Sequence, residues 1–109
     1  TADDHRMYNR NGEAFDKGET FAGVPYDVAL EAVEEIRALV PQDVTMAQMA
    51  LRWILMEDAV SVVIPGAKNA LQAQSNAASS DVPALSTEVM TALRAVYDDR
   101  IAPHVHHRW

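Results

Sequence analysis

The segment AVSVVIPG, residues 59–66, constrains the fold of this chain more than any other. Its β-favouring residues follow one another without polar alternation, which is typical of a strand buried on both faces of a parallel sheet. A parallel strand needs neighbouring strands to complete its backbone hydrogen bonds. The sequence predicts one strand, near residues 60–64, and no neighbour for it. This pattern therefore indicates an excerpt from a larger α/β repeat.

Helices are predicted for most of the chain beyond residue 25. Apolar residues recur there every three or four positions, as on the buried face of an amphipathic helix. Pro41 disfavours helical geometry at the residue before it and so separates the first two helices. The predicted helices lie near residues 26–40, 45–57, 69–80 and 86–101. The chain is therefore predicted to be mostly α-helical, with four helices and one strand.

Several helix ends carry recognisable capping residues. Thr45, with Gln48 three positions later, fits a capping box, in which two side chains satisfy otherwise unpaired backbone N–H groups. Ser86 is predicted to cap the last helix. Pro103 is predicted to end that helix and to leave HVHHRW as a tail.

The helix predicted near residues 45–57 is apolar on nearly every side. Such a helix has to be covered by protein on more than one face. Four of its large side chains are assigned to the core: Met46, Met49, Trp53 and Met56.

Residues 1–25 differ from the rest of the chain. They mix charges, glycines and scattered aromatic residues with no sustained period, which predicts a long loop. A loop of this length is usually a lid or a binding loop, or else it is disordered. The chain is accordingly divided into a loop at residues 1–25 and a partial domain at residues 26–109.

Length, charge and cysteine content exclude several classes of function. A chain of 109 residues forms one modest domain or a piece of a larger one. Its net charge of −7 argues against binding to nucleic acids or anionic membranes. It has no cysteine, which excludes disulfides, thiolate nucleophiles and cysteine-based zinc sites. No apolar stretch approaches the roughly 18 residues of a membrane span, so a cytoplasmic protein is expected.

Three histidines near the C-terminus, His104, His106 and His107, raise the question of a metal site. Histidine is a common metal ligand. The predicted tail, however, offers these rings no fixed acidic partner. They are interpreted as packing or substrate-side residues, and no metal site is predicted.

The turn that follows the predicted strand has the features of an anion site. A strand that turns directly into a helix directs backbone N–H groups and the positive end of the helix dipole at one point. Gly66 permits close approach of a ligand to the backbone, and Lys68 adds a cation. Lys68, Gln72 and Asn76 are spaced four apart and are predicted to share one face, with Ser75 beside them. This polar strip fits a phosphate followed by a ribose and a base, although the same spacing also fits an ordinary solvated turn.

Longer motifs give the chain a resemblance to a known family. The run LRWILxxxxVxxVIPGAKNxxQxxxN, residues 51–76, closely resembles the last β/α unit of the aldo-keto reductases. DHRxxNRxGEAFDxGETFxGVPY and the ending RIxPxVHHRW are similar to one bacterial branch of that family. These enzymes are (β/α)8 barrels of about 250 residues or more. The resemblance implies that this chain corresponds to the C-terminal third, with residues 1–25 as the cofactor-covering loop.

The resemblance also implies a cofactor, NADPH, bound without a Rossmann motif. By position, Gly66, Ala67 and Lys68 would surround the adenosine 2′-phosphate, Gln72 would stand where many members have arginine or glutamine, and Asn76 would contact adenine. At the position of Ser75, many relatives carry an acidic residue, and that acidic residue contacts the adenine amine. Serine is a poorer hydrogen-bond acceptor than a carboxylate, so the resemblance at this position does not by itself predict the cofactor affinity or a preference for NADPH over NADH.

The resemblance implies an oxidoreductase that reduces aldehydes and ketones with an aspartate, tyrosine, lysine and histidine tetrad. The tetrad positions lie upstream of this chain, and Asp4, His5, Tyr8 and Lys17 match none of its motifs. No catalytic residue is assigned, and the chain alone is expected to be inactive. Its expected partner is the N-terminal part of the barrel or a second copy, and its expected substrate in the complete enzyme is a small carbonyl compound. The alternatives are a non-catalytic self-associating helical module and a nucleotide-binding remnant.

Overall fold

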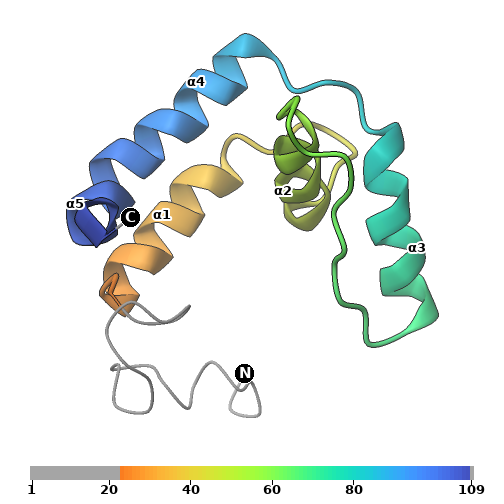
Figure 1. Cartoon of the computed structure of the whole chain (residues 1–109), viewed down its shortest axis with the longest axis horizontal. Coiled ribbons are helices and arrows are strands. Elements are labelled where there is room, and N and C mark those ends of the chain that lie inside the picture. The colour runs from red at the N-terminus through yellow and green to blue at the C-terminus, as the bar shows by residue number, and fades with distance from the viewer. Residues whose placement is uncertain (1–22, 109) are drawn as a thin grey trace. The chain divides into compact units, whose positions relative to one another are not determined.

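The computed structural model describes residues 23–108, which form helices joined by short connections and one extended segment (Figure 1). The described residues form two compact units, residues 37–92 and residues 23–36 with 93–108. The elements are α1 (Tyr26–Arg37), α2 (Met46–Leu55), α3 (Ala70–Ala78), the 3₁₀ turn η2 (Ser79–Asp81), α4 (Thr87–Val96), the π-helical η3 (Tyr97–Ile101), α5 (Ala102–Val105) and the 3₁₀ turn η4 (His106–Arg108).

The mostly helical prediction is confirmed, and the four main helices lie where the sequence places them. Their starts follow the predicted capping rules. Thr45 and Gln48 form the complete capping box at α2, with both backbone-to-side-chain distances at 3.1 Å. The Ser86 Oγ accepts from the Val89 N–H at 3.2 Å. Side-chain capping is a local interaction, which is why the sequence alone predicts these helix starts.

The predicted strand near residues 60–64 is wrong for the chain as described, because residues 60–67 adopt no regular secondary structure. The segment is extended, but no strand is present anywhere in residues 23–108. Val62 and Ile64 are 69% and 90% exposed. The sequence pattern identifies the β-favouring residues correctly, but a strand exists only when a neighbour completes its hydrogen bonds.

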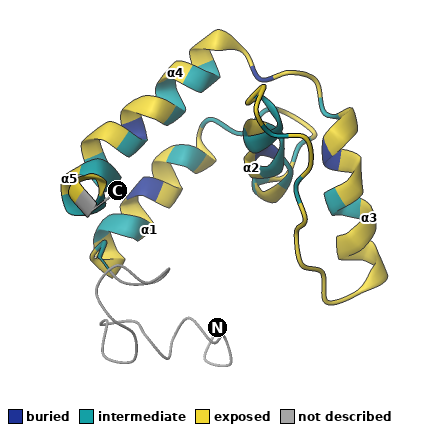
Figure 2. Cartoon of the chain, viewed as in Figure 1, coloured by how far each residue is buried: buried dark blue, intermediate teal, exposed yellow. Residues whose placement is uncertain are grey.

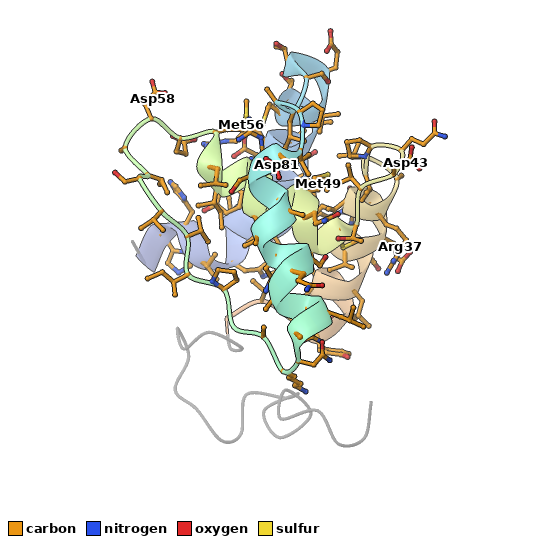
Figure 3. The ribbon with its side chains drawn as sticks, turned by 90° about the vertical axis from the view of Figure 1, so that its right-hand side faces the viewer. Arg37, Asp43, Met49, Met56, Asp58 and Asp81 are labelled. Carbon is orange, nitrogen blue, oxygen red and sulfur yellow. The ribbon has the colours of Figure 1, made fainter. Side chains whose placement is uncertain are left out.

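The unit of residues 37–92 has its core where α2, α3 and η2 contact one another. Met49 is 1% exposed, and Ser79 and Leu85 are also buried (Figure 2). Figure 3 labels Met49 on α2, with α3 in front of it in that view. The Gln48 Nε2 donates to the Ser75 carbonyl at 3.1 Å and so ties α2 to α3.

The expectation that α2 is covered on several faces is met only in part by the described residues. Of the four side chains assigned to its core, Met49 alone is buried. Trp53 is 43% exposed. Met46 and Met56 are half-buried. One apolar face of this helix therefore packs within the unit, and the Trp53 face stays accessible.

The second unit joins α1 to the C-terminal helical residues. Ala32 and Val96 are its buried apolar residues. Arg100 bridges to two carboxylates of α1, its Nη2 lying 2.6 Å from the Glu35 Oε1 and its Nη1 lying 3.0 Å from the Glu31 Oε2. Glu31 and Glu35 are four residues apart and therefore share a helix face. The hydrogen bond to Glu35 and the nearby carboxylates raise the pKa of Arg100.

The prediction that Pro103 ends the last helix and leaves an irregular tail is wrong. The chain continues as α5 and η4, and Pro103 lies in the first turn of α5. A first-turn residue needs no backbone N–H donor within its helix, so proline is tolerated there. The preceding residues widen into a π-helix, in which the Ala102 N–H bonds to the Tyr97 carbonyl five residues back. None of the helices in residues 23–108 is long and apolar enough to cross a membrane.

Candidate functional site

The candidate site is the glycine–lysine loop, residues 66–69, together with the first two turns of α3. Asn69 is the N-cap of α3, and its Oδ1 accepts from the Gln72 N–H at 2.9 Å. The helix starts immediately after the loop because asparagine is a favoured N-cap residue. The N–H groups of Ala70 and Leu71, the first two residues of α3, have no acceptor within the helix.

Two side chains of α3 hold the loop in place. The Gln72 Oε1 accepts from the Lys68 backbone N–H at 2.7 Å. The Asn76 Nδ2 donates to the Gly66 carbonyl at 3.1 Å. The loop is therefore fixed to the helix at both ends, by residues one helical turn apart.

The space in front of the loop is open. A Cβ atom built on Gly66 meets no atom within 4 Å. The backbone of Gly66 lies outside the left-handed region, so glycine is not required there by conformation. Lys68 is exposed beside it. An open glycine, a cation and unpaired N–H groups at a helix start are the features that a phosphate group requires, and the residues present therefore fit one.

The predicted polar strip is present for Gln72 and Asn76 but differs from the prediction at Lys68. Gln72 and Asn76 share one face of α3, and each contacts the loop. Lys68 precedes the helix, so it joins the strip through its backbone N–H instead of stacking on the helix surface. Ser75 is half-buried, and its carbonyl accepts from Gln48. The roles of these residues toward a cofactor stay predictions.

A cavity of about 380 Å³ lies in the same unit, between α2, the extended segment and α3. Figures 1 and 3 show the extended segment running alongside α3. The cavity is lined by Leu51, Leu55, Ser61, Val62, Val63, Pro65, Ala67, Ala73, Asn76, Ala77, Ser79 and Ser80. Asn76 belongs both to this lining and to the strip that holds the loop. Ala67, predicted to lie near the phosphate, faces this cavity as part of its lining.

Sequence reasoning missed two features that organise the site, the N-cap role of Asn69 and the contact of Gln48 with α3. Asn69 has a local signal, because an asparagine three residues before a helical glutamine fits an N-cap pattern. The second hydrogen bond of Gln48, to Ser75, has no such signal. It joins residues 27 positions apart and depends on how the two helices pack.

Other candidate groups lie away from the loop or outside the description. Asp4, His5, Tyr8 and Lys17 fall outside residues 23–108, as does nearly all of the predicted loop at residues 1–25. His106 Nδ1 is 2.8 Å from the Tyr97 hydroxyl, which gives that ring a packing and hydrogen-bonding partner. Residues 23–108 contain no group of three histidine, aspartate or glutamate side chains arranged to hold a metal ion.

Comparison with known proteins gives the family. The profile of the Aldo/keto reductase family matches residues 2–98, and the chain belongs to that family. It is therefore of oxidoreductase lineage, and members of the family typically use NAD(P)H. No curated protein and no solved structure matches the chain.

Proposed function

We propose that this chain supplies the adenosine 2′-phosphate and adenine site of an NADPH-dependent reductase of aldehydes and ketones. In this proposal it corresponds to the C-terminal third of a (β/α)8 barrel from the bacterial branch that its motifs resemble. The observation that carries the proposal is the open loop at Gly66 and Lys68, held at the start of α3. In barrels of this class, phosphate sites often lie at the loops after the last two strands.

The hydrogen bonds of the loop define what each side chain offers a ligand. Gln72 uses its Oε1 on the Lys68 N–H, which leaves its NH₂ group to donate to a phosphate oxygen. Asn76 uses its Nδ2 on the Gly66 carbonyl, which leaves its Oδ1 to accept from the amine of adenine. Lys68 supplies the positive charge.

Bound NADPH would supply the hydride for carbonyl reduction, and the residues of this chain would bind and orient its adenosine end. In aldo-keto reductases the proton donor is the tyrosine of the tetrad, for which residues 1–109 offer no matching motif. The chain alone is therefore proposed to be inactive. In this proposal Ser75 stands near adenine with a hydroxyl where an acidic acceptor is common, which weakens the contact with the adenine amine.

The proposal is tested by binding of adenosine fragments to the chain. Adenosine 2′,5′-bisphosphate carries the phosphate that the loop would contact, and adenosine 5′-monophosphate lacks it. Calorimetric titration is expected to give tighter binding of the bisphosphate by about tenfold to hundredfold, the range of a charge-assisted hydrogen bond. Equal affinities would remove the basis for a 2′-phosphate site.

A second candidate function, a non-catalytic self-associating module, is favoured by the exposed apolar side chains of the same unit. Val62, Ile64 and Leu71 are 69%, 90% and 77% exposed. Large exposed apolar side chains in one region are typical of interaction surfaces. Light scattering on the chain distinguishes the two ideas, since a concentration-dependent oligomer without affinity for the bisphosphate would favour this second candidate.

A further inference from the structure

We propose that Tyr97 and His106 form a pair of nucleophile and general base, a site at which activated sulfonyl or phosphoryl groups are transferred to the tyrosine oxygen. The pair lies in the unit of residues 23–36 and 93–108, not in the unit that carries the glycine–lysine loop. The Tyr97 hydroxyl is 2.8 Å from the His106 Nδ1. The two rings meet edge to face, with their centroids 6.0 Å apart and their planes at 75°.

The irregular helix between the two residues brings them together. They are nine positions apart. In a continuous α-helix they would project from opposite sides, because nine residues make about two and a half turns. Instead, the Ala102 N–H bonds to the Tyr97 carbonyl five residues back, and Ile101 takes a φ of −105° where α5 begins. Such π-helical turns are rare and often lie at functional sites. The contact is therefore a product of the π-helix.

The hydrogen bond between the two side chains suits proton transfer. A neutral histidine with its proton on Nε2 has a lone pair on Nδ1, which accepts from the tyrosine hydroxyl. The distance of 2.8 Å lies within the range of about 2.6–3.2 Å that a general base requires. His106 is exposed, so its ring can pass the proton on to water. Activation by an adjacent base is a common way to make a hydroxyl nucleophilic.

A positive charge lies beside the tyrosine ring. The Arg94 Cζ is 5.6 Å from the centroid of the Tyr97 ring, within the range of a cation–π contact. The Arg94 Nε donates to both carboxylate oxygens of Asp98, at 3.1 and 3.2 Å, which holds the guanidinium in place. A nearby cation favours the negative charge that develops on the hydroxyl oxygen as its proton leaves. Asp98 offsets part of this cation, so His106 is assigned the larger share of the activation.

The reaction with an arylsulfonyl fluoride shows the proposed step. The Tyr97 oxygen attacks the sulfur, the S–O bond forms as the S–F bond breaks, and fluoride leaves. The hydroxyl proton passes to the His106 Nδ1 and then from the ring to water. A sulfonylated oxygen cannot donate to His106, so the modification also removes the hydrogen bond that joins η4 to η3.

Labelling of the full chain with benzenesulfonyl fluoride, followed by mass mapping of its peptides, tests the pair. Tyr26, which is 38% exposed on α1, is the internal reference. Tyr97 should react about tenfold faster or more, a modest part of the roughly 10²–10⁴-fold that a general base contributes in enzymes. His106→Gln keeps an acceptor for the hydroxyl but removes the base, so Tyr97 should slow to about the rate of Tyr26. His107→Gln removes a neighbouring exposed histidine and should change nothing.

The ratio of Tyr97 to Tyr26 labelling in the parent chain decides the proposal without any variant, because equal rates would overturn it. A rate in His106→Gln equal to that of the parent would mean that His106 only holds the tyrosine, and would also overturn it, as would a label on His106 in place of Tyr97. Protection of the Ala102 amide from hydrogen exchange verifies that the π-helix persists in each variant. No cofactor enters these measurements, so the proposed function stands or fails separately.

Discussion

At residue 66, backbone geometry does not require glycine, and the proposed phosphate site assigns it the role of keeping the backbone accessible to a ligand. Its φ lies outside the left-handed region, and a Cβ there meets no atom within 4 Å. Gly66→Ala should therefore stabilise the protein by about 0.4–1 kcal/mol, because alanine lowers the entropy of the unfolded chain. Binding of both NADPH and NADH should weaken, because the added methyl group occupies the approach to the loop.

Urea denaturation and fluorescence titration measure these two effects of Gly66→Ala separately. The expected result is a higher free energy of unfolding together with weaker binding of both cofactors. An alanine variant that is more stable and binds both cofactors as well as the parent protein would mean that no ligand approaches the backbone at this position.

A different residue, Asp43, does have an unusual backbone conformation. Its φ of 62° closes the turn between α1 and α2, in which the Val44 N–H bonds to the Pro41 carbonyl at 3.3 Å. Aspartate tolerates the left-handed region, whereas β-branched residues do not. Asp43→Val should destabilise the protein by about 1–2 kcal/mol. Asp43→Gly is the control and should be neutral or slightly stabilising in thermal unfolding; equal stability of the valine and glycine variants would contradict the role of this turn.

Among the elements, α2 is stabilised by one side chain, that of Gln48, which makes two different hydrogen bonds. The Gln48 Oε1 completes the capping box, and its Nε2 bonds to the Ser75 carbonyl of α3. Thr45→Ala removes only the cap and should cost about 1 kcal/mol. Gln48→Ala keeps the backbone bond to the Thr45 Oγ but removes both side-chain bonds of Gln48 and leaves a part-buried carbonyl of α3 without this donor, so it should cost about 1 kcal/mol more.

Chemical denaturation of the Thr45→Ala and Gln48→Ala variants tests this difference. Cofactor affinity adds an independent measurement, since only the glutamine variant disturbs α3. Equal losses of stability with unchanged binding in both variants would show that the bond between α2 and α3 contributes nothing.

At the scale of elements, the sequence predicts those features that depend on interactions between residues close together in the chain. Helix starts at Thr45 and Ser86 follow from side chains that reach backbone groups three residues away. The strand near residues 60–64 fails because pairing is not a local property of the segment. The sequence does not predict that the helical residues continue past Pro103, because proline is common both just after the end of a helix and in the first turn of the next one.

The candidate site was predictable to a similar extent. The types and spacing of Gly66, Lys68, Gln72 and Asn76 indicate a polar strip next to a tight turn. Sequence spacing does not say which end of an amide meets the loop, nor that Lys68 joins through its backbone. Those features depend on distances of about 3 Å set by the folded loop.

In the described part of the chain, large apolar side chains are exposed and a buried polar atom has no hydrogen-bond partner. Val62 and Ile64 are exposed, and the buried Nε of Arg52 has no hydrogen-bond partner among residues 23–108. Buried polar atoms are normally paired, and exposed strand-like backbone readily pairs with another chain. We therefore propose that the extended segment is completed by further protein, the N-terminal part of the barrel.

Hydrogen exchange of the amides at residues 61–64 tests this proposal. In the 109-residue chain alone, these amides should exchange at nearly unprotected rates, because no strand pairs with them. In the complete reductase they should be slowed by about a hundredfold or more, as core strands are. Protection in the chain alone, accompanied by a dimeric mass, would instead mean that a second copy covers the segment.

The central claim is that the loop at Gly66 and Lys68 binds the 2′-phosphate of NADPH. The most direct test is the ratio of NADPH to NADH affinity in Lys68→Ala, measured by fluorescence titration in the complete reductase. NADPH binding should weaken by about tenfold to hundredfold while NADH binding is nearly unchanged, because only NADPH carries the phosphate that this charge would contact. Arg94→Ala removes the same charge from the other unit and should leave the ratio unaltered. Equal losses for NADPH and NADH in Lys68→Ala would show that Lys68 is only a solvated surface charge, and would contradict the account.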